Sequence, residues 1–208
     1  MYANSFDTPQ EAWDWIQATI ELQGKEFVTV DGVMTKELEN VVVSIRKPGV
    51  GWPLRGCEWS NMIPLLEYAR QLQSPDVAGF EYTYGNRLTA YFGVNQIEEA
   101  IELLQKFRAV RFATMVLWDP VRDLADEQVP VATIEHPLRE KPCMTLIHLL
   151  VRENKLNVTV VFRAQDMLRA WPTNVFGIYK LQEYIAGEVD ADVGTLTMIA
   201  ISAHRYFK

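Results

Sequence analysis

The chain has 208 residues, of which 49% are hydrophobic and 23% charged, and its formal net charge is −7. This composition is ordinary for a soluble globular protein, and the length suffices for one sizeable core, so a single domain over residues 1–208 is expected. The acidic balance argues against a general nucleic-acid binder. No apolar run approaches the roughly 20 residues that span a membrane. The opening residues show no secretion signal and there are only two cysteines, so we expect a cytoplasmic protein with free thiols.

Local patterns predict helices and strands in mixed order. Thr8 can cap a first helix, Pro9 suits its first position and Glu11 completes a capping box, while Asp31-Gly32 marks a turn between two strands. The order fits one α+β domain with a mixed, largely antiparallel sheet packed with helices. In chain order, the expected elements are a helix in 7–23, two strands in 25–49, a helix in 60–72, a segment of mixed signal in 82–93, a helix in 95–107, a strand in 110–118, a long connection in 119–142, strands in 143–151 and 156–164, a helix in 173–186 and a strand in 193–207.

The strands 143–151 and 156–164 are joined by a short polar turn, so they should pair antiparallel and bring their far ends together. Cys143 then lies level with residues 163–165. An arginine near a cysteine favours the thiolate, the form that attacks electrophilic carbon. The alternative is structural, because a lone cysteine at the start of a strand is more often a core residue, and Arg163 with Asp166 is usually a solvated ion pair.

Four short motifs change this balance through their order and spacing. They are Pro142-Cys143, Arg163-x-x-Asp166, Pro172-x-Asn174 and His204-x-Tyr206. The steps from the cysteine to the arginine, the asparagine and the histidine are 20, 31 and 61 residues. The ordered set resembles the thymidylate synthase family, in its short archaeal-type branch, and "YTYGNRL", "LLEYA", "LWDP" and "LQEYIA" agree with it. The resemblance covers roughly residues 60–206 and implies a thymidylate-synthase-like fold.

By position, the resemblance implies catalytic roles for several residues. Cys143 matches the nucleophile that adds to C6 of a pyrimidine nucleotide, and Tyr84 matches the tyrosine beside C5. Glu67 in "LLEYA" matches the proton-handling glutamate, within a two-residue slip of the local alignment. Arg163 matches the arginine that contacts phosphate and cysteine, and Asp166 matches the acid at the pterin and water network.

Further residues are implied at the nucleotide and at a subunit interface. Asn174 matches the asparagine that reads the base, and its amide can pair with N3–H and O4 of uracil, whereas a carboxylate would suit cytosine. His204 and Tyr206 match the pair at the sugar hydroxyl. Arg111 matches an arginine that reaches the partner subunit's phosphate, which implies a homodimer. Trp171, next to a proline, is expected at a pocket wall on the donor side.

The resemblance implies a reduced folate, as methylenetetrahydrofolate or methylenetetrahydromethanopterin, as the one-carbon donor. No metal is expected, since three scattered histidines and two distant cysteines have no metal-site spacing. Cys57 is read as incidental, and His148 as a core or dimer-interface histidine.

The sequence departs from the family around the phosphate and the donor. Each lost charged contact should cost about 1.5–3 kcal/mol, so two losses should weaken nucleotide binding roughly a hundredfold. The departures are Phe112 and Ala164 in place of an arginine and a serine, Met34 or Thr35 with Lys36 nearby in place of another arginine, Arg169 in place of an apolar residue, and an end at Lys208 where the family has a closing tail.

Three functions follow from these observations. The leading one is transfer of a one-carbon unit to C5 of a uracil nucleotide, dUMP to dTMP. The second is a pyrimidine nucleotide hydroxymethyltransferase, which needs no hydride step. The third is a nucleotide-binding homodimer without activity, suggested by the eroded phosphate site.

Overall fold

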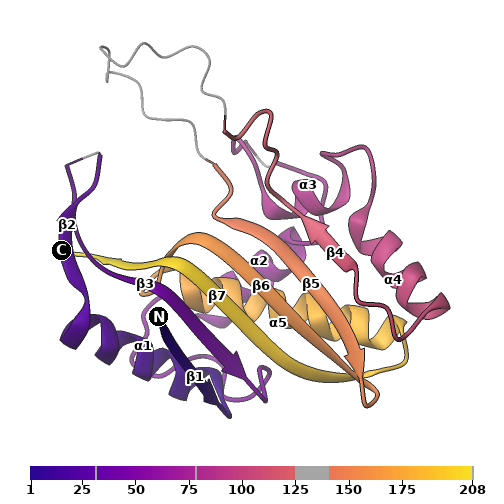
Figure 1. Ribbon diagram of the computed structural model, residues 1–208, viewed down its shortest axis with the longest axis horizontal. Coiled ribbons are helices and arrows are strands. Elements are labelled where there is room, and N and C mark those ends of the chain that lie inside the picture. Colours follow the sequence, from indigo (N-terminus) through magenta and orange to yellow (C-terminus); the bar gives the residue numbers. More distant parts are fainter. Residues whose placement is uncertain (31, 78, 125–140, 208) are drawn as a thin grey trace.

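A computed structural model describes residues 1–30, 32–77, 79–124 and 141–207 (Figure 1). Seven strands and five helices lie within these ranges. In chain order they are β1 (Tyr2–Phe6), α1 (Pro9–Gln23), β2 (Lys25–Val28), β3 (Met34–Ile45), α2 (Met62–Gln71), α3 (Tyr84–Thr89), α4 (Gln96–Lys106), β4 (Ala113–Val116), β5 (Met144–Arg152), β6 (Lys155–Asp166), α5 (Ala170–Glu188) and β7 (Asp192–Tyr206).

The described strands form one sheet in the order β1-β3-β7-β6-β5-β4, with β2 also paired to β3. Two of the pairs, β1 with β3 and β6 with β7, are parallel, and the other four are antiparallel. The predicted α+β class with a mixed, largely antiparallel sheet is therefore confirmed. Strand β1 was not predicted, because its sequence YANSF has a mostly exposed pattern with no apolar alternation.

The first helix forms as its capping pattern predicts. The Thr8 hydroxyl accepts a hydrogen bond from the Glu11 amide, and the Glu11 carboxylate accepts one from the Thr8 amide at 3.0 Å. Two of the four amides left open at a helix start are satisfied in this way. Ile16 and Ile20, on one stripe of α1, are then buried against the sheet. The turn predicted at Asp31-Gly32 is only partly visible, since residue 31 lies outside the described residues.

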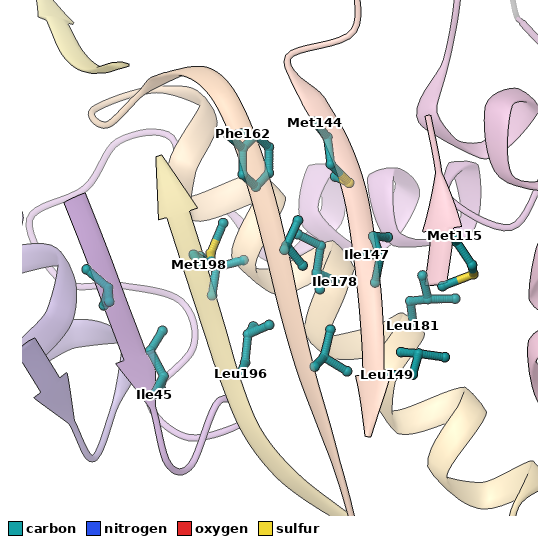
Figure 2. Packing of buried hydrophobic residues seen from close by; sticks show 14 of the residues in the cluster. Ile45, Met115, Met144, Ile147, Leu149, Phe162, Ile178, Leu181, Leu196 and Met198 are labelled. Carbon is teal, nitrogen blue, oxygen red and sulfur yellow. The ribbon is translucent and has the colours of Figure 1, made fainter. Parts of the chain in front are cut away.

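One face of the sheet is covered by α5, which begins three residues earlier and ends two residues later than predicted. Figure 2 shows Ile178 and Leu181 of this helix packed among Ile147, Leu149 and other side chains from the strands. In Figure 1 the opposite face of β5, β6 and β7 is seen without a described helix over it. The helix side is thus the core, and the other face is open in the described chain.

The strand pairing is interrupted at one level across three strands. Arg163 of β6 and Ile201 of β7 are skipped between the pairs on either side, and so is Asn40 of β3, whose φ is +58°. The burial alternation resets there, because Phe162 and Gln165 are both buried while the two residues between them are half-exposed. This interruption places the Arg163 side chain at the end of the hairpin, where Cys143 also lies.

Candidate active site

Cys143 is a half-buried residue directly before β5. Its carbonyl accepts a hydrogen bond of 2.8 Å from the Arg163 amide, and the next pair along the hairpin is Met144 with Phe162. The prediction that the far ends of the hairpin meet, with Cys143 level with Arg163, is confirmed.

The Arg163 guanidinium braces the segment that leads to Cys143. Its Nε donates to the Pro142 carbonyl at 3.0 Å, and its Nη2 donates to the Lys141 carbonyl at 2.9 Å. The guanidinium also lies 5.8 Å from the ring of Trp118. A planar guanidinium that makes two hydrogen bonds restrains the backbone well. Arg163 therefore holds in place the backbone segment that leads to Cys143. Its effect on thiolate formation stays a prediction.

Tyr84 begins α3, and its hydroxyl oxygen accepts a hydrogen bond of 3.3 Å from the amide of Met144, the residue after the cysteine. Burial of that hydroxyl raises the pKa of Tyr84 well above its ordinary value of 10.0. Tyr84 therefore stays a neutral phenol. Helix α3 can lie close against the end of α2 because residue 85 is glycine. A Cβ added to Gly85 would lie 1.8 Å from the carbonyl oxygen of Gln71, the last residue of α2.

Tyr68 of α2 joins this group, although the sequence analysis did not single it out. Its hydroxyl donates to Oδ1 of Asn174, a residue of α5 that is only 6% exposed. Burial raises the pKa of Tyr68 as well, with smaller contributions from neighbouring Tyr82 and Cys143. Since Oδ1 must accept from the phenol, this bond fixes which way the Asn174 amide faces. The only available signal for Tyr68 was its place in "LLEYA".

The structure does not support the prediction for Glu67. Its side chain is exposed on α2, whereas the adjacent Tyr68 turns toward Asn174. A slip of two residues in either direction reaches Leu65 or Ala69, which are both buried and apolar. Neighbours on a helix point about 100° apart, so only one of residues 67 and 68 can face the cluster. At this place α2 contributes a phenol.

Asp166, His204 and Tyr206 lie together at the ends of β6 and β7. The Asp166 carboxylate accepts hydrogen bonds from the Leu168 and Arg169 amides at 2.9 and 3.0 Å, which fixes its orientation. His204 pairs with Asp166 on one side and with Glu37 of β3 on the other, and its ring is 5.1 Å from that of Tyr206. The geometry keeps these three predicted residues together.

Burial lowers the pKa of His204 below its ordinary value of 6.5, although Asp166 and Glu37 oppose the shift. The folded state therefore prefers the neutral ring, and the unfolded state binds its proton at higher pH. The contribution of His204 to the free energy of unfolding should be fully present above pH 6.5. It should fall as the pH drops below 6.5, by at most about 1.4 kcal/mol per pH unit between the pKa values of the unfolded and folded states. Urea unfolding at pH 7.5 and 5.5 should show a larger loss for the wild type than for His204→Gln; equal losses would contradict this.

Trp171 was predicted to lie at a pocket wall, but it does not line an open pocket. It is 1% exposed and belongs to the main hydrophobic core, because the first turn of α5 faces the sheet. The aromatic ring that remains accessible nearby is Trp59, which is 42% exposed and lies 5.6 Å from the Arg169 guanidinium.

Cys57 is partly buried, which raises the pKa of its thiol.

Two positions at which the sequence departs from the expected phosphate contacts have other surroundings. Lys36 donates to the Glu21 carbonyl and forms an ion pair with the Glu21 carboxylate at 3.5 Å, so it is bound to α1. Ala164, where the family has a serine, is paired across the sheet with Ser202 of β7. A hydroxyl thus stands on the neighbouring strand at the level of the missing one.

Arg111 is exposed and lies just before β4, far from the Cys143 of its own chain. Ala113 pairs with Leu149, six residues along β5 from Cys143. At about 3.3 Å per residue, the separation along the strand is about 20 Å. The structure therefore does not bring Arg111 to the cluster formed by Cys143, Tyr84, Tyr68 and Asn174.

No group of three or more histidine, cysteine, aspartate or glutamate side chains in the described ranges could hold a metal ion. Within the same residues, no helix combines the length and apolar character needed to cross a membrane.

Comparisons with known proteins agree on one family. The model of the family described as "Thymidylate synthase" matches residues 52–208. A protein of Methanothermobacter marburgensis is 37% identical over 99% of this chain and 93% of its own length. A protein of Methanosarcina acetivorans is 39% identical over 88% of this chain and 79% of its own length, and one of Methanothermobacter thermautotrophicus is 36% identical over 94% and 89%. All three carry the printed name "Putative thymidylate synthase".

Proposed function

We propose a function from one premise, that this chain belongs to the thymidylate synthase family. The proposed reaction is transfer of a one-carbon unit to C5 of a uracil nucleotide, with dUMP as substrate and dTMP as product. One observation carries the proposal: Tyr68, Tyr84, Cys143 and Asn174, which come from four separate segments of the chain, lie in one cluster, and the ends of this set are 106 positions apart.

The Cys143 thiolate adds to C6 of the uracil ring, which places the electron pair on C5 and O4 and makes C5 nucleophilic. Asn174 reads the base edge: its Nδ2 donates to O4, and the second lone pair of Oδ1 accepts from N3–H while Tyr68 occupies the first. Tyr84, a neutral phenol beside Cys143, can donate or accept a hydrogen bond near C5. Once C5 has bonded to the one-carbon unit and lost its proton to solvent, delivery of a hydride to the new carbon would expel the Cys143 thiolate and restore the C5–C6 double bond.

A reduced folate or methanopterin would supply the one-carbon unit and the electrons that make it a methyl group. The residues near the end of β6 fit such a group. Asp166 holds a fixed carboxylate, which suits the N–H donors of an aminopyrimidine ring. The adjacent Arg169 and exposed Trp59 offer a cation and an aromatic face beside it.

The test is release of tritium from C5 of labelled dUMP in the presence of methylenetetrahydrofolate or methylenetetrahydromethanopterin. We expect release with at least one donor at saturating dUMP. Absence of release with both donors, from folded protein, would refute the reaction. Mass spectrometry of the product would separate a methyl from a hydroxymethyl group.

The proposed active form is a homodimer in which Arg111 reaches the partner subunit's site. An apolar row supports it: Val116, Leu146, Val161, Ile199 and Val42 pair side by side across five strands on the open face. At one end of this row, Val116 and Leu146 line an apolar hollow together with Trp118 and Arg163. Such a face is typical of surfaces that associate.

Val161→Lys puts a charge in the middle of the apolar row and should convert a dimer into a monomer, because an unpaired lysine is costly at a desolvated interface. Sedimentation equilibrium should give twice the chain mass of 23.9 kDa for the wild type and about the single mass for the variant. Leu22→Lys is the matched control, since Leu22 is 82% exposed on α1, away from the open face. A monomeric wild type, or a dimeric Val161→Lys, would contradict the interface.

A further inference from the structure

We propose that the buried ion pair of Arg87 and Asp123 is a positioning device, which holds α3 so that Tyr84 meets the segment carrying Cys143. The two residues are 36 positions apart. Arg87 lies within "YTYGNRL", but the sequence assigned no role to it or to Asp123. The inference rests on the proposed function only for its activity measurement, because the arrangement itself can be tested through the reactivity of the Cys143 thiol.

The pair is bidentate and almost completely buried. Arg87 Nη1 and Nη2 donate to the two carboxylate oxygens of Asp123 at 3.0 and 2.8 Å. The two residues are 6% and 7% exposed. A fork that binds both oxygens fixes angle as well as distance. Within the described chain, Arg87 is thus tied rigidly to the connection that follows β4.

Further bonds join this connection to α3. We call the network formed by Arg87, Tyr91, Asp119 and Asp123 the frame. The Asp119 amide donates to Asp123 at 2.8 Å, and the Tyr91 hydroxyl donates to Asp119 at 2.8 Å. The Tyr91 ring in turn lies under the Arg87 guanidinium, at 3.9 Å. Gln96 donates to the Arg87 carbonyl at 3.0 Å and also exchanges hydrogen bonds with the backbone of Val116 in β4.

The frame reaches the thiol through Tyr84. Arg87 and Tyr84 lie three positions apart on the same helix, so they are neighbours across one turn. The Tyr82 ring contacts both, at 6.0 Å from the guanidinium and 5.8 Å from the Tyr84 ring. Helix α3 has only six residues, too few to be stable by its own hydrogen bonds. Its orientation, and with it the Tyr84 bond to Met144, must come from tertiary contacts such as this pair.

Stability alone is a weak reason for a buried ion pair, because apolar replacements of similar volume are often as stable. Orientation is the better reason here, since an apolar contact would let the short helix slide or rotate. A positioning role therefore predicts that conservative changes disturb catalysis and thiol reactivity more than substrate affinity.

The experiment compares Arg87→Lys and Asp123→Asn with Arg108→Gln in the full chain. Arg108 is the matched control, because it also joins separate segments, donating to the Val189 and Asp190 carbonyls and to Asn154, but at a distant corner. Two readouts are used: kcat and KM for tritium release, and the pH dependence of Cys143 alkylation by iodoacetamide, followed by peptide mass mapping to separate it from Cys57.

Arg87→Lys and Asp123→Asn should each lower kcat at least about tenfold with KM for dUMP within about threefold. Each should also move the midpoint of the alkylation curve by at least about half a pH unit, while Arg108→Gln changes neither readout. Folded variants with wild-type kcat and alkylation curves would overturn the inference. If both variants fail to fold, Tyr91→Phe decides: it removes only the hydroxyl bond to Asp119, and an unchanged alkylation curve would refute the frame.

If the wild type releases no tritium, the proposed function fails. The alkylation curves of the same proteins still test the positioning role, because they need no turnover.

Discussion

Replacing Cys143 by alanine should reduce tritium release from C5 of dUMP by at least about 10⁴-fold. The reason is chemical: without the sulfur no covalent bond forms at C6, C5 never becomes nucleophilic, and the C5 proton is not lost. Cys143 is half-buried and its segment is braced by Arg163 and Tyr84 through backbone bonds, so its removal should not collapse the fold. The measurement is release at saturating nucleotide and donor, with the fold checked by circular dichroism.

The chain contains its own control for this experiment. Cys57 is the other cysteine; it is partly buried, burial raises the pKa of its thiol, and that thiol faces the Leu168 carbonyl. Cys57→Ala should retain release within about threefold of the wild type. A Cys143→Ala variant that still releases tritium at a comparable rate would exclude Cys143 as the nucleophile. A Cys57→Ala variant that releases no tritium would indicate that Cys57 is needed instead.

Replacing Asn174 by aspartate should lower kcat/KM for dUMP by about 10²–10³-fold and shift the preference toward dCMP. The Tyr68 hydroxyl can still donate to Oδ1, so the side chain should keep its orientation. The second oxygen then stands where the amide nitrogen donated, and it faces O4 of uracil with two acceptors opposed. With cytosine the same oxygen can accept from the amino group, and buried unpaired polar groups are penalised strongly in such discrimination.

The readout for Asn174→Asp is a competition between dUMP and dCMP, scored by product mass. Asn4→Asp, on exposed β1, adds the same charge elsewhere and should leave the preference unchanged. Tyr68→Phe is informative in a different way: it leaves the amide in place but removes the bond that orients it, so dUMP turnover should fall by about three- to tenfold. An Asn174→Asp variant that still strongly prefers dUMP would show that this residue does not read the base edge.

Several local elements were predictable because their partners lie close by in the sequence. The capping box at Thr8 identified the start of α1. The helix expected in 95–107, where Ile97, Ile101 and Leu104 recur at helical spacing, is α4, which begins at Gln96 after the Asn95 cap. The short turn of the β5–β6 hairpin made the meeting of Cys143 and Arg163 a matter of strand register. The segment of mixed signal in 82–93 could not be assigned, because α3 depends on a glycine that contacts α2 and on an arginine paired with a distant aspartate.

Most helices and strands, the hairpin and the ordered set of motifs that identified the family could be predicted from the sequence. Which side chains lie together is known only from the folded chain: Tyr68 and not Glu67 turns toward Asn174, Trp171 is enclosed in the core, and Arg87 meets Asp123. The parallel pairing of β1 with β3 could not be predicted either. All of these have one cause. Capping, periodicity and tight turns are encoded within a few residues, whereas burial and pairing across the chain depend on the packing of the whole sheet and its helices.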